Sequence, residues 1–288
     1  MDTIKTINGF VNLGNTCFMN SALQLMIHCT DMSQLLMVYR SQQPIVTGYR
    51  KLLKVYGSNN KRILDPSGVR KLMGVVHRRY TRGSQEDSHE FIIHLLDQLE
   101  EAIKKEDKEV AKLITKLFDC KVETTFRSLE SAEKSAVVEP VRFLSIPIST
   151  KSGADLDDCF NLFIEPETLS EKWITPSGKS EQAQHSTRIV KFPRNLIFQI
   201  KRYSYHHGGR KLNYRINIPS EWKAPTGEMF DLEGFINQSG GLNSGHYTCC
   251  AKVGKQWYRF NDRSVVKIDK TRALIEAASS YLIRYKKR

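Results

Sequence analysis

The sequence predicts an α+β fold in which helices come first and a β-sheet follows. Up to about residue 105, apolar residues recur with the period of amphipathic helices. Beyond about residue 120, short β-branched and aromatic runs are separated by turn-forming residues. The 288 residues can bury one large core, and no internal repeat or low-complexity segment divides them. We therefore expect a single domain over residues 1–288.

Helices are expected wherever apolar side chains would share one face. The expected helices cover residues 16–29, 32–39, 45–56, 66–79, 86–105 and, further along, 156–163. Gly14 and Asn15 provide a turn before the first helix, for which Thr16 is a suitable N-cap. Pro66 fits the first turn of the fourth helix. The charged stretch 100–112 is expected to end the fifth helix and to act as a linker.

The remaining elements are expected to be strands. They cover residues 121–126, 137–148, 188–192, 196–205, 215–218, 229–237, 245–253 and 257–261. Two glycine-containing loops, 205–211 and 238–245, are candidate gates beside a binding cleft. For the first of these loops, a plain hairpin turn is an equally good interpretation.

Residues 9–24, GFVNLGNTCFMNSALQ, place a cysteine at a turn-to-helix junction. Cys17 falls in the first turn of the first expected helix, where the helix dipole and free N–H groups favour the nucleophilic thiolate. Asn12, five residues earlier, can place a carboxamide N–H beside the sulfur, where an oxyanion would develop. The alternative is a small buried cysteine that merely opens a helix.

A cysteine nucleophile needs a base, and His246 is the best candidate among the eight histidines. It lies in NSGHYTCC, which indicates a loop that leads into a buried strand, and a second aromatic strand follows in QWYRFND. If these strands are antiparallel neighbours, Asn261 or Asp262 lies beside His246, accepts the ring N–H and fixes the tautomer. The alternative is a core histidine with its hydrogen bonds satisfied.

A third segment, GSQEDSHEF at residues 83–91, opens the amphipathic helix expected over 86–105. Ser84 or Asp87 can cap its N-terminus, and acidic residues in a first turn complement the helix dipole. One interpretation of Asp87 and Glu90 is therefore that they only stabilise the start of this helix.

These three segments together resemble the Cys box, the QQDAHEF segment and the His box of the ubiquitin-specific proteases. The resemblance extends over residues 9–285 and implies a papain-like fold, with nucleophile-bearing helices against a sheet that carries the base. It implies a helical thumb over about 9–115, short β fingers over about 118–141 and 171–189, and a β palm in the remainder to 285.

The resemblance also implies a role for each site residue. Cys17 would be the nucleophile and His246 the base. Asn261 would be the third catalytic residue, Asp262 a neighbouring acid that adds negative charge, and Asn12 the donor that stabilises the oxyanion.

Four further residues are implied to bind the substrate. In this family, acidic residues of the QQDAHEF segment bind the arginines of ubiquitin's extended tail, a role that falls to Asp87 and Glu90. Gln85 and Tyr247 are implied to help hold the same tail.

The implied function is that of a deubiquitinating thiol hydrolase. Such an enzyme cleaves the peptide or isopeptide bond after the C-terminal Gly-Gly of ubiquitin and needs no cofactor. One alternative is a protease for a ubiquitin-like modifier, which the triad cannot discriminate. The other is a catalytically dead ubiquitin-binding module, against which the intact Cys17, His246 and Asn261 argue.

The six cysteines show no disulfide framework and favour a reducing, intracellular compartment, cytoplasmic or nuclear. No Cys-x-x-Cys pair occurs, whereas many members of the family bind zinc through two such pairs on the fingers. We therefore expect no metal and fingers held by sheet packing alone. The adjacent His206 and His207 are expected to lie in a solvated hairpin loop.

The net charge of +13 is spread along the chain. No regular spacing of aromatic and basic residues indicates a nucleic-acid platform, so a soluble basic surface is the favoured interpretation. No apolar run approaches the ~18 residues of a membrane span. We expect a monomer whose partners are ubiquitin or ubiquitin-conjugated proteins.

Overall fold

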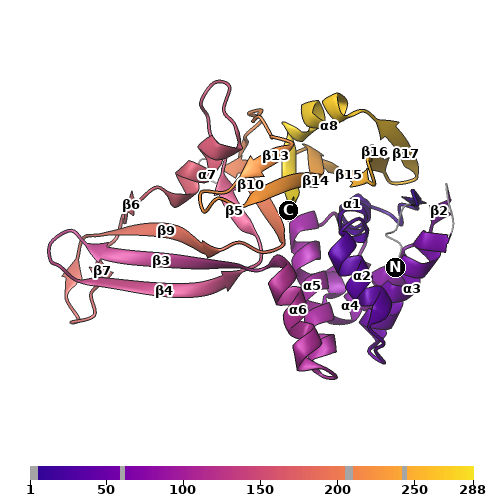
Figure 1. Cartoon of the computed structure of the whole chain (residues 1–288), viewed down its shortest axis with the longest axis horizontal. Helices are drawn as coiled ribbons and strands as arrows, with labels where there is room; N and C mark the ends of the chain where they lie inside the picture. The colour runs from indigo at the N-terminus through magenta and orange to yellow at the C-terminus, as the bar shows by residue number, and fades with distance from the viewer. Residues whose placement is uncertain (1–5, 59–61, 205–209, 242–244) are drawn as a thin grey trace.

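The computed structural model describes residues 6–58, 62–204, 210–241 and 245–288. A helical lobe lies against a central sheet, and a narrow arm of strands extends away from both (Figure 1). Residues 205–209 of the first candidate gating loop, which include His206 and His207, and residues 242–244 of the second lie outside the described residues.

The helical lobe contains the five long helices expected from the sequence and one more. They are α1 (Cys17–Ile27), α2 (Thr30–Val38), α3 (Pro44–Ser58), α4 (Ser67–Val76), α5 (Ser88–Lys104) and α6 (Lys108–Phe118). The helix expected over 66–79 is shorter than predicted, and a 3-10 turn, η1 (Arg78–Thr81), follows it. The short helix expected over 156–163 is α7 (Leu156–Ile164).

The expectation of a charged linker over 100–112 is wrong, because α6 begins within it. Asp107 caps this helix by accepting hydrogen bonds from two backbone N–H groups of the first turn, at 2.9 and 3.0 Å. One face is apolar and buried, and it consists of Ala111, Ile114 and Phe118. The high charge of the segment lies on the opposite face of an amphipathic helix.

Among the described residues, the central sheet has eight strands in the order β17-β16-β15-β14-β18-β10-β5, with β13 beside β14. The strands are β5 (Leu144–Pro147), β10 (Asn195–Lys201), β13 (Glu221–Lys223), β14 (Met229–Gly240), β15 (Gly245–Val253), β16 (Gln256–Asn261), β17 (Ser264–Ile268) and β18 (Ser280–Lys287). Neighbouring strands are antiparallel except β5 and β10, which are parallel.

Two strand expectations need correction. The run 137–148 is divided between two strands, because residues 142–143 turn from β4 (Lys134–Val141) in the arm to β5 in the central sheet. The run 215–218 forms no strand and makes only an isolated bridge between Asn217 and Asp155. The sequence also did not predict β17 or the helix α8 (Lys270–Ala277) after it.

The strand β18 was also not predicted, although it lies in the middle of the sheet between β14 and β10. Its apolar run is interrupted by Arg284, whose side chain is nevertheless fully buried. The guanidinium donates to the backbone oxygen of His28 at 3.0 Å and to the Asn195 side chain at 3.3 Å. These partners partly offset the cost of burying the charge.

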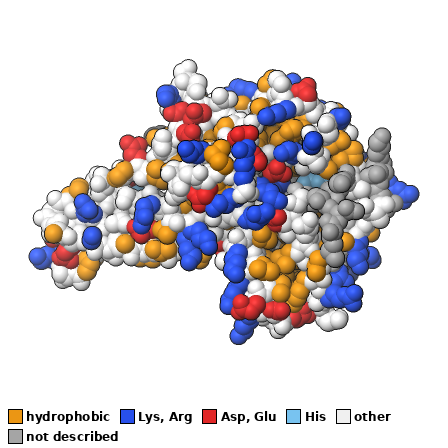
Figure 2. All heavy atoms as spheres, in the orientation of Figure 1, with side chains coloured by type: hydrophobic (Ala, Val, Ile, Leu, Met, Phe, Trp, Pro, Cys, Tyr) orange, Lys and Arg blue, Asp and Glu red, His pale blue; other side chains and the backbone are white. Residues whose placement is uncertain are grey.

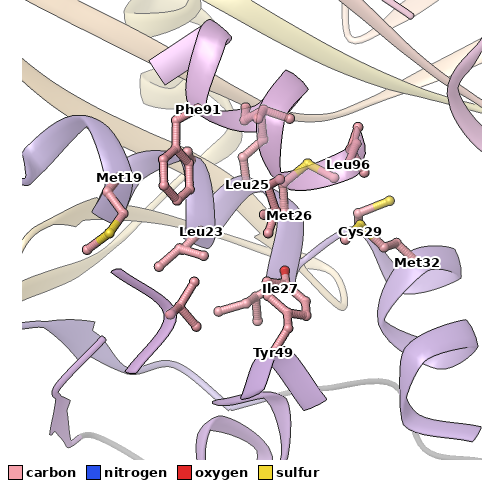
Figure 3. Close-up of a cluster of buried hydrophobic side chains, with 14 of the residues drawn as sticks. Met19, Leu23, Leu25, Met26, Ile27, Cys29, Met32, Tyr49, Phe91 and Leu96 are labelled. Atoms are coloured by element: carbon pink, nitrogen blue, oxygen red, sulfur yellow. The ribbon is translucent and has the colours of Figure 1, made fainter. Parts of the chain in front are cut away.

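Helices cover the sheet and create two hydrophobic cores. One core lies between the sheet and the helical lobe, where α1 is surrounded by side chains of α2, α3 and α5 (Figure 3). The other lies on the opposite face, against α7 and α8. Cys249 contributes to the first core and Cys250 to the second, as expected for adjacent residues of a strand. No described helix is long and apolar enough to cross a membrane.

The arm is a four-stranded sheet in the order β4-β3-β9-β6. Its further strands are β3 (Cys120–Ser128), β6 (Glu167–Thr168) and β9 (Ala183–Lys191), and the hairpin of β7 (Trp173–Ile174) and β8 (Ser180–Glu181) lies near its far end (Figure 1). At its base, the Arg142 guanidinium binds carboxylates of α5 and of the segment after α6. These are Asp97, Glu100 and Asp119, at 2.6, 2.5 and 2.8 Å.

The far end of the arm is held by more than sheet packing, so that expectation is wrong. The Glu181 carboxylate accepts hydrogen bonds from the hydroxyls of Ser128 and Ser131, both at 2.6 Å. These hydroxyls hold the pKa of Glu181 below its usual value. A carboxylate and two hydroxyls therefore crosslink this end of the arm. Among the described residues, no three His, Cys, Asp or Glu side chains form a possible metal site.

The absence of zinc stays a prediction, and metal analysis tests it. Purified protein is expected to contain well under one equivalent of zinc, because the arm presents hydroxyls and a carboxylate and no thiolate cluster. A chelator should leave the melting temperature unchanged, whereas Glu181→Gln should lower it. A stoichiometric zinc ion whose removal melts the arm would contradict this prediction.

Candidate active site

Cys17 is the first residue of α1, and the turn before it has the predicted form. Gly14 and Asn15 both have positive φ, at 86° and 54°, and Thr16 is the N-cap residue. The Thr16 hydroxyl does not cap the helix, because it accepts from the backbone N–H of Leu13 at 2.8 Å. The turn is therefore fixed internally, and α1 packs directly against β15.

Residue Cys17 is 3% exposed, and burial raises the pKa of its thiol. The backbone N–H of Tyr247 opposes this rise, and the negative charge of Asp262 adds to it. In the free protein, burial therefore outweighs the expected effect of the helix N-terminus. The thiol needs a nearby proton acceptor before it can attack a carbonyl.

His246 lies on β15 and Asn261 at the end of the neighbouring strand β16, as the sequence predicted. The ring Nε2 of His246 is 2.7 Å from the Asn261 side-chain oxygen. Because this oxygen can only accept, Nε2 carries the proton and Nδ1 is left with a lone pair. The arrangement leaves Nδ1 available to act as a base.

The carboxylate of Asp262 bonds to two asparagine side chains and not to the His246 ring. Its two carboxylate oxygens accept hydrogen bonds from the side-chain amides of Asn12 and Asn20, at 2.8 and 2.7 Å. Asp262 has a φ of 47°, and its backbone oxygen accepts from Phe10 at 2.8 Å. Asp262 thus orients Asn12, the predicted oxyanion donor. Asn20 was missed, and an asparagine on the buried face of an apolar helix was the signal that could have found it.

The backbone of the N-terminal segment lies close to the turn between β16 and β17, which carries Asp262. A Cβ at Gly9 would lie 2.5 Å from the backbone oxygen of Arg263, so only glycine fits there. The segment that leads to Cys17 and the turn that carries Asp262 are therefore in direct contact.

A cleft of about 640 Å³ includes Tyr247, the residue after His246, in its lining, and three of the four predicted tail-binding residues line it. They are Gln85, Asp87 and Tyr247. Glu86 and Tyr281 also line it, and the sequence interpretation missed both. Gln85 reaches across to the segment before His246, where its side-chain oxygen accepts from the Gly245 N–H at 2.7 Å.

The fourth residue, Glu90, does not line this cleft. Its carboxylate forms an ion pair with Arg79 at 3.0 Å. His89 packs edge-on against Phe143, with 4.7 Å between the ring centroids.

Comparison with known proteins places this arrangement in a family. The family model described as ubiquitin carboxyl-terminal hydrolase matches residues 8–285. The chain belongs to the ubiquitin carboxyl-terminal hydrolase family. The match confirms the family resemblance predicted from the three segments.

Two curated relatives show how much of their length this chain matches. Ubiquitin carboxyl-terminal hydrolase Usp2 of Drosophila melanogaster is 24% identical over 325 residues, covering 97% of this chain and 34% of the relative. Ubiquitin carboxyl-terminal hydrolase 8 of Saccharomyces cerevisiae is 26% identical over 341 residues, covering 99% and 71%. The chain thus spans about a third of the first relative's length.

Solved structures of the SAGA DUB module confirm the α+β fold. The Ubp8/Sgf11/Sus1/Sgf73 module bound to monoubiquitin aligns with a TM-score of 0.84 at 24% identity, over 100% of this chain and 70% of the other. The module bound to ubiquitin aldehyde gives 0.83 at 24% identity, over 100% and 71%. The division into thumb, fingers and palm and the individual site roles stay predictions.

Proposed function

We propose that this protein is a deubiquitinating thiol hydrolase that cleaves the peptide or isopeptide bond after the C-terminal Gly-Gly of ubiquitin. One observation carries the proposal: Cys17 faces the backbone of Tyr247, which directly follows His246, whose Nε2 is held by Asn261. A thiol, a base with a fixed tautomer and an orienting amide are the components of nucleophilic catalysis by cysteine. The family assignment supports the substrate.

One chemical task is proposed for each residue. The Cys17 sulfur attacks the carbonyl carbon of the terminal glycine while Nδ1 of His246 takes the thiol proton. The Asn12 amide, oriented by Asp262, stabilises the oxyanion. His246 then protonates the leaving amine as the carbon–nitrogen bond breaks. Water, deprotonated by the same ring, hydrolyses the thioester and restores the thiol.

Substrate binding is proposed to occur in the cleft lined by Gln85, Asp87 and Tyr247. The structural relatives bind ubiquitin, and Tyr247, whose backbone N–H faces Cys17, lines the cleft, so a substrate tail bound there would lie near the thiol.

We propose that the protein acts as an intracellular monomer, in the cytoplasm or nucleus, without a dedicated nucleic-acid site. All six cysteines are free and buried, which suits a reducing compartment. On the visible face, Lys and Arg side chains are spread from the arm to the helical lobe, with Asp and Glu between them (Figure 2). Such mixing of charges does not favour a continuous track for a phosphate backbone.

A ubiquitin probe with a C-terminal electrophile tests the function, with protein mass as the readout. We expect one probe molecule per chain, attached to Cys17, because the Cys17 thiol faces the backbone N–H of Tyr247, next to the proposed base His246. A matched panel of probes from ubiquitin-like modifiers that end in Leu-Arg-Gly-Gly tests the alternative substrate. Faster labelling by one of those probes would show that the protein prefers that modifier to ubiquitin. Absence of labelling by any probe would support a dead binding module.

A further inference from the structure

The carboxylate of Asp87 is fully engaged within the protein before any substrate arrives. One oxygen accepts from the backbone N–H groups of His89 and Glu90, at 2.6 and 3.3 Å, and so caps α5. The other accepts from the hydroxyls of Tyr281 at 2.7 Å and Tyr247 at 3.5 Å. An arginine of a substrate tail would have to compete with four donors for this carboxylate.

Tyr281 connects Asp87 to three strands of the central sheet. Its hydroxyl accepts from the Gln199 side chain at 2.8 Å, and Gln199 in turn accepts from the Ser145 hydroxyl at 2.5 Å. Tyr281 and Tyr247 are 5% and 9% exposed, and their ring centroids lie 6.3 Å apart. A partly buried chain of hydrogen bonds therefore runs from β5 through β10 and β18 to the N-terminus of α5 in the helical lobe.

Tyr247 links this chain to the nucleophile. Its hydroxyl points to Asp87, and its backbone N–H faces the Cys17 thiol. The segment before Tyr247 is also bonded to the residues that precede α5, because the backbone N–H of Gly245 donates to the side-chain oxygen of Gln85. The position of β15, which carries the base, relative to α1, which carries the thiol, therefore depends on the hydrogen bonds that Gln85 and Asp87 accept.

We propose that Asp87 is a positioning residue that holds Tyr247 and Tyr281 so that β15 presents its backbone N–H and His246 to Cys17. The inference rests on the proposed function and assigns Asp87 to the alignment of the reacting groups, in place of the arginine-binding role that the family resemblance implied. Loss of the carboxylate leaves a phenol hydroxyl without its acceptor in a buried site, which displaces the ring and the strand that carries it.

The test compares Asp87→Asn with Asp107→Asn, because Asp107 caps α6 with the same geometry, and no hydroxyl of a described tyrosine donates to its carboxylate. Asparagine caps a helix nearly as well as aspartate, so both variants should fold with similar melting temperatures. Asp87→Asn is expected to lower kcat for a ubiquitin–fluorophore substrate about 10- to 100-fold, with a much smaller change in KM. Asp107→Asn should leave both constants near wild type.

Two further measurements separate positioning from substrate binding. Tyr281→Phe removes the donor but keeps the ring, and its effect on kcat should not add to that of Asp87→Asn. The rate at which a small alkylating reagent modifies Cys17 should also fall in Asp87→Asn, because the displaced Tyr247 N–H no longer lowers the pKa of the thiol. This rate does not depend on ubiquitin, so it tests the proposal even if the proposed function fails.

A rise in KM for the ubiquitin substrate, with kcat and the alkylation rate unchanged, would show that Asp87 binds the tail and would overturn the proposal. Additive effects of Asp87→Asn and Tyr281→Phe would do the same, since they would show that the two groups act separately.

Discussion

Replacement of Cys17 with alanine is expected to abolish hydrolysis of a ubiquitin–fluorophore substrate and formation of the probe adduct. Loss of a catalytic nucleophile lowers turnover by on the order of 10⁴-fold or more. The fold should persist, because the thiol is a small group at the start of a helix whose turn is fixed by Asn12, Thr16 and the backbone. Binding of ubiquitin should therefore remain measurable by titration.

A matched variant is Cys159→Ala, which removes a buried thiol on α7, in the core on the far side of the sheet. This change should leave turnover near wild type, at the cost of some stability from a small cavity. Retained cleavage in Cys17→Ala would show that another residue is the nucleophile.

Asp262→Ala is expected to lower kcat at least as much as Asn261→Ala. Asp262 is the acceptor that fixes the Asn12 amide, and loss of an oxyanion donor costs about 10²- to 10³-fold in kcat. An amide at position 261 can orient the His246 ring but cannot balance the charge of the imidazolium. Steady-state kinetics on the same ubiquitin substrate compare the two variants.

Asp262→Asn is the control for backbone strain, because asparagine also tolerates the positive φ of this residue. It should still impair kcat, since one of the two amides now meets an NH₂ group. Asn12→Ala should add little to Asp262→Ala, because both changes remove the same donor. If Asp262→Ala proves neutral while Asn261→Ala is inactive, Asp262 has only a structural role.

Local signals explain which parts of the site were predictable. The turn before Cys17 is specified by Gly14 and Asn15 within a few residues, and the His246–Asn261 pair follows from one hairpin. For residues that act over long sequence separations, no local signal identifies the partner. Asn20 meets Asp262 across 242 residues, and Tyr281 meets Asp87 across 194. Nothing near either residue in sequence indicates its partner.

The fold shows the same division. Five helices of the lobe follow from apolar periodicity, and α6 was missed because its charged face dominated a short segment. The strand β18 was missed because Arg284 interrupts its apolar run. In the structure, a backbone oxygen and a side-chain amide oxygen accept hydrogen bonds from the Arg284 guanidinium. The absence of Cys-x-x-Cys pairs was visible in the sequence. The carboxylate and hydroxyls that crosslink the arm instead come from segments about fifty residues apart.

The position of β18 has a consequence for how the protein can be made. During synthesis, β10 and β14 emerge from the ribosome well before residues 280–287, yet each needs that segment as its neighbour. Until it arrives, the nascent sheet has two exposed inner edges, which invite pairing with other chains. Arg284 must also reach the backbone of His28, made 256 residues earlier. Nascent chains that stop before residue 280 should therefore depend on chaperones and stay inactive, even though Cys17, His246 and Asn261 are already present.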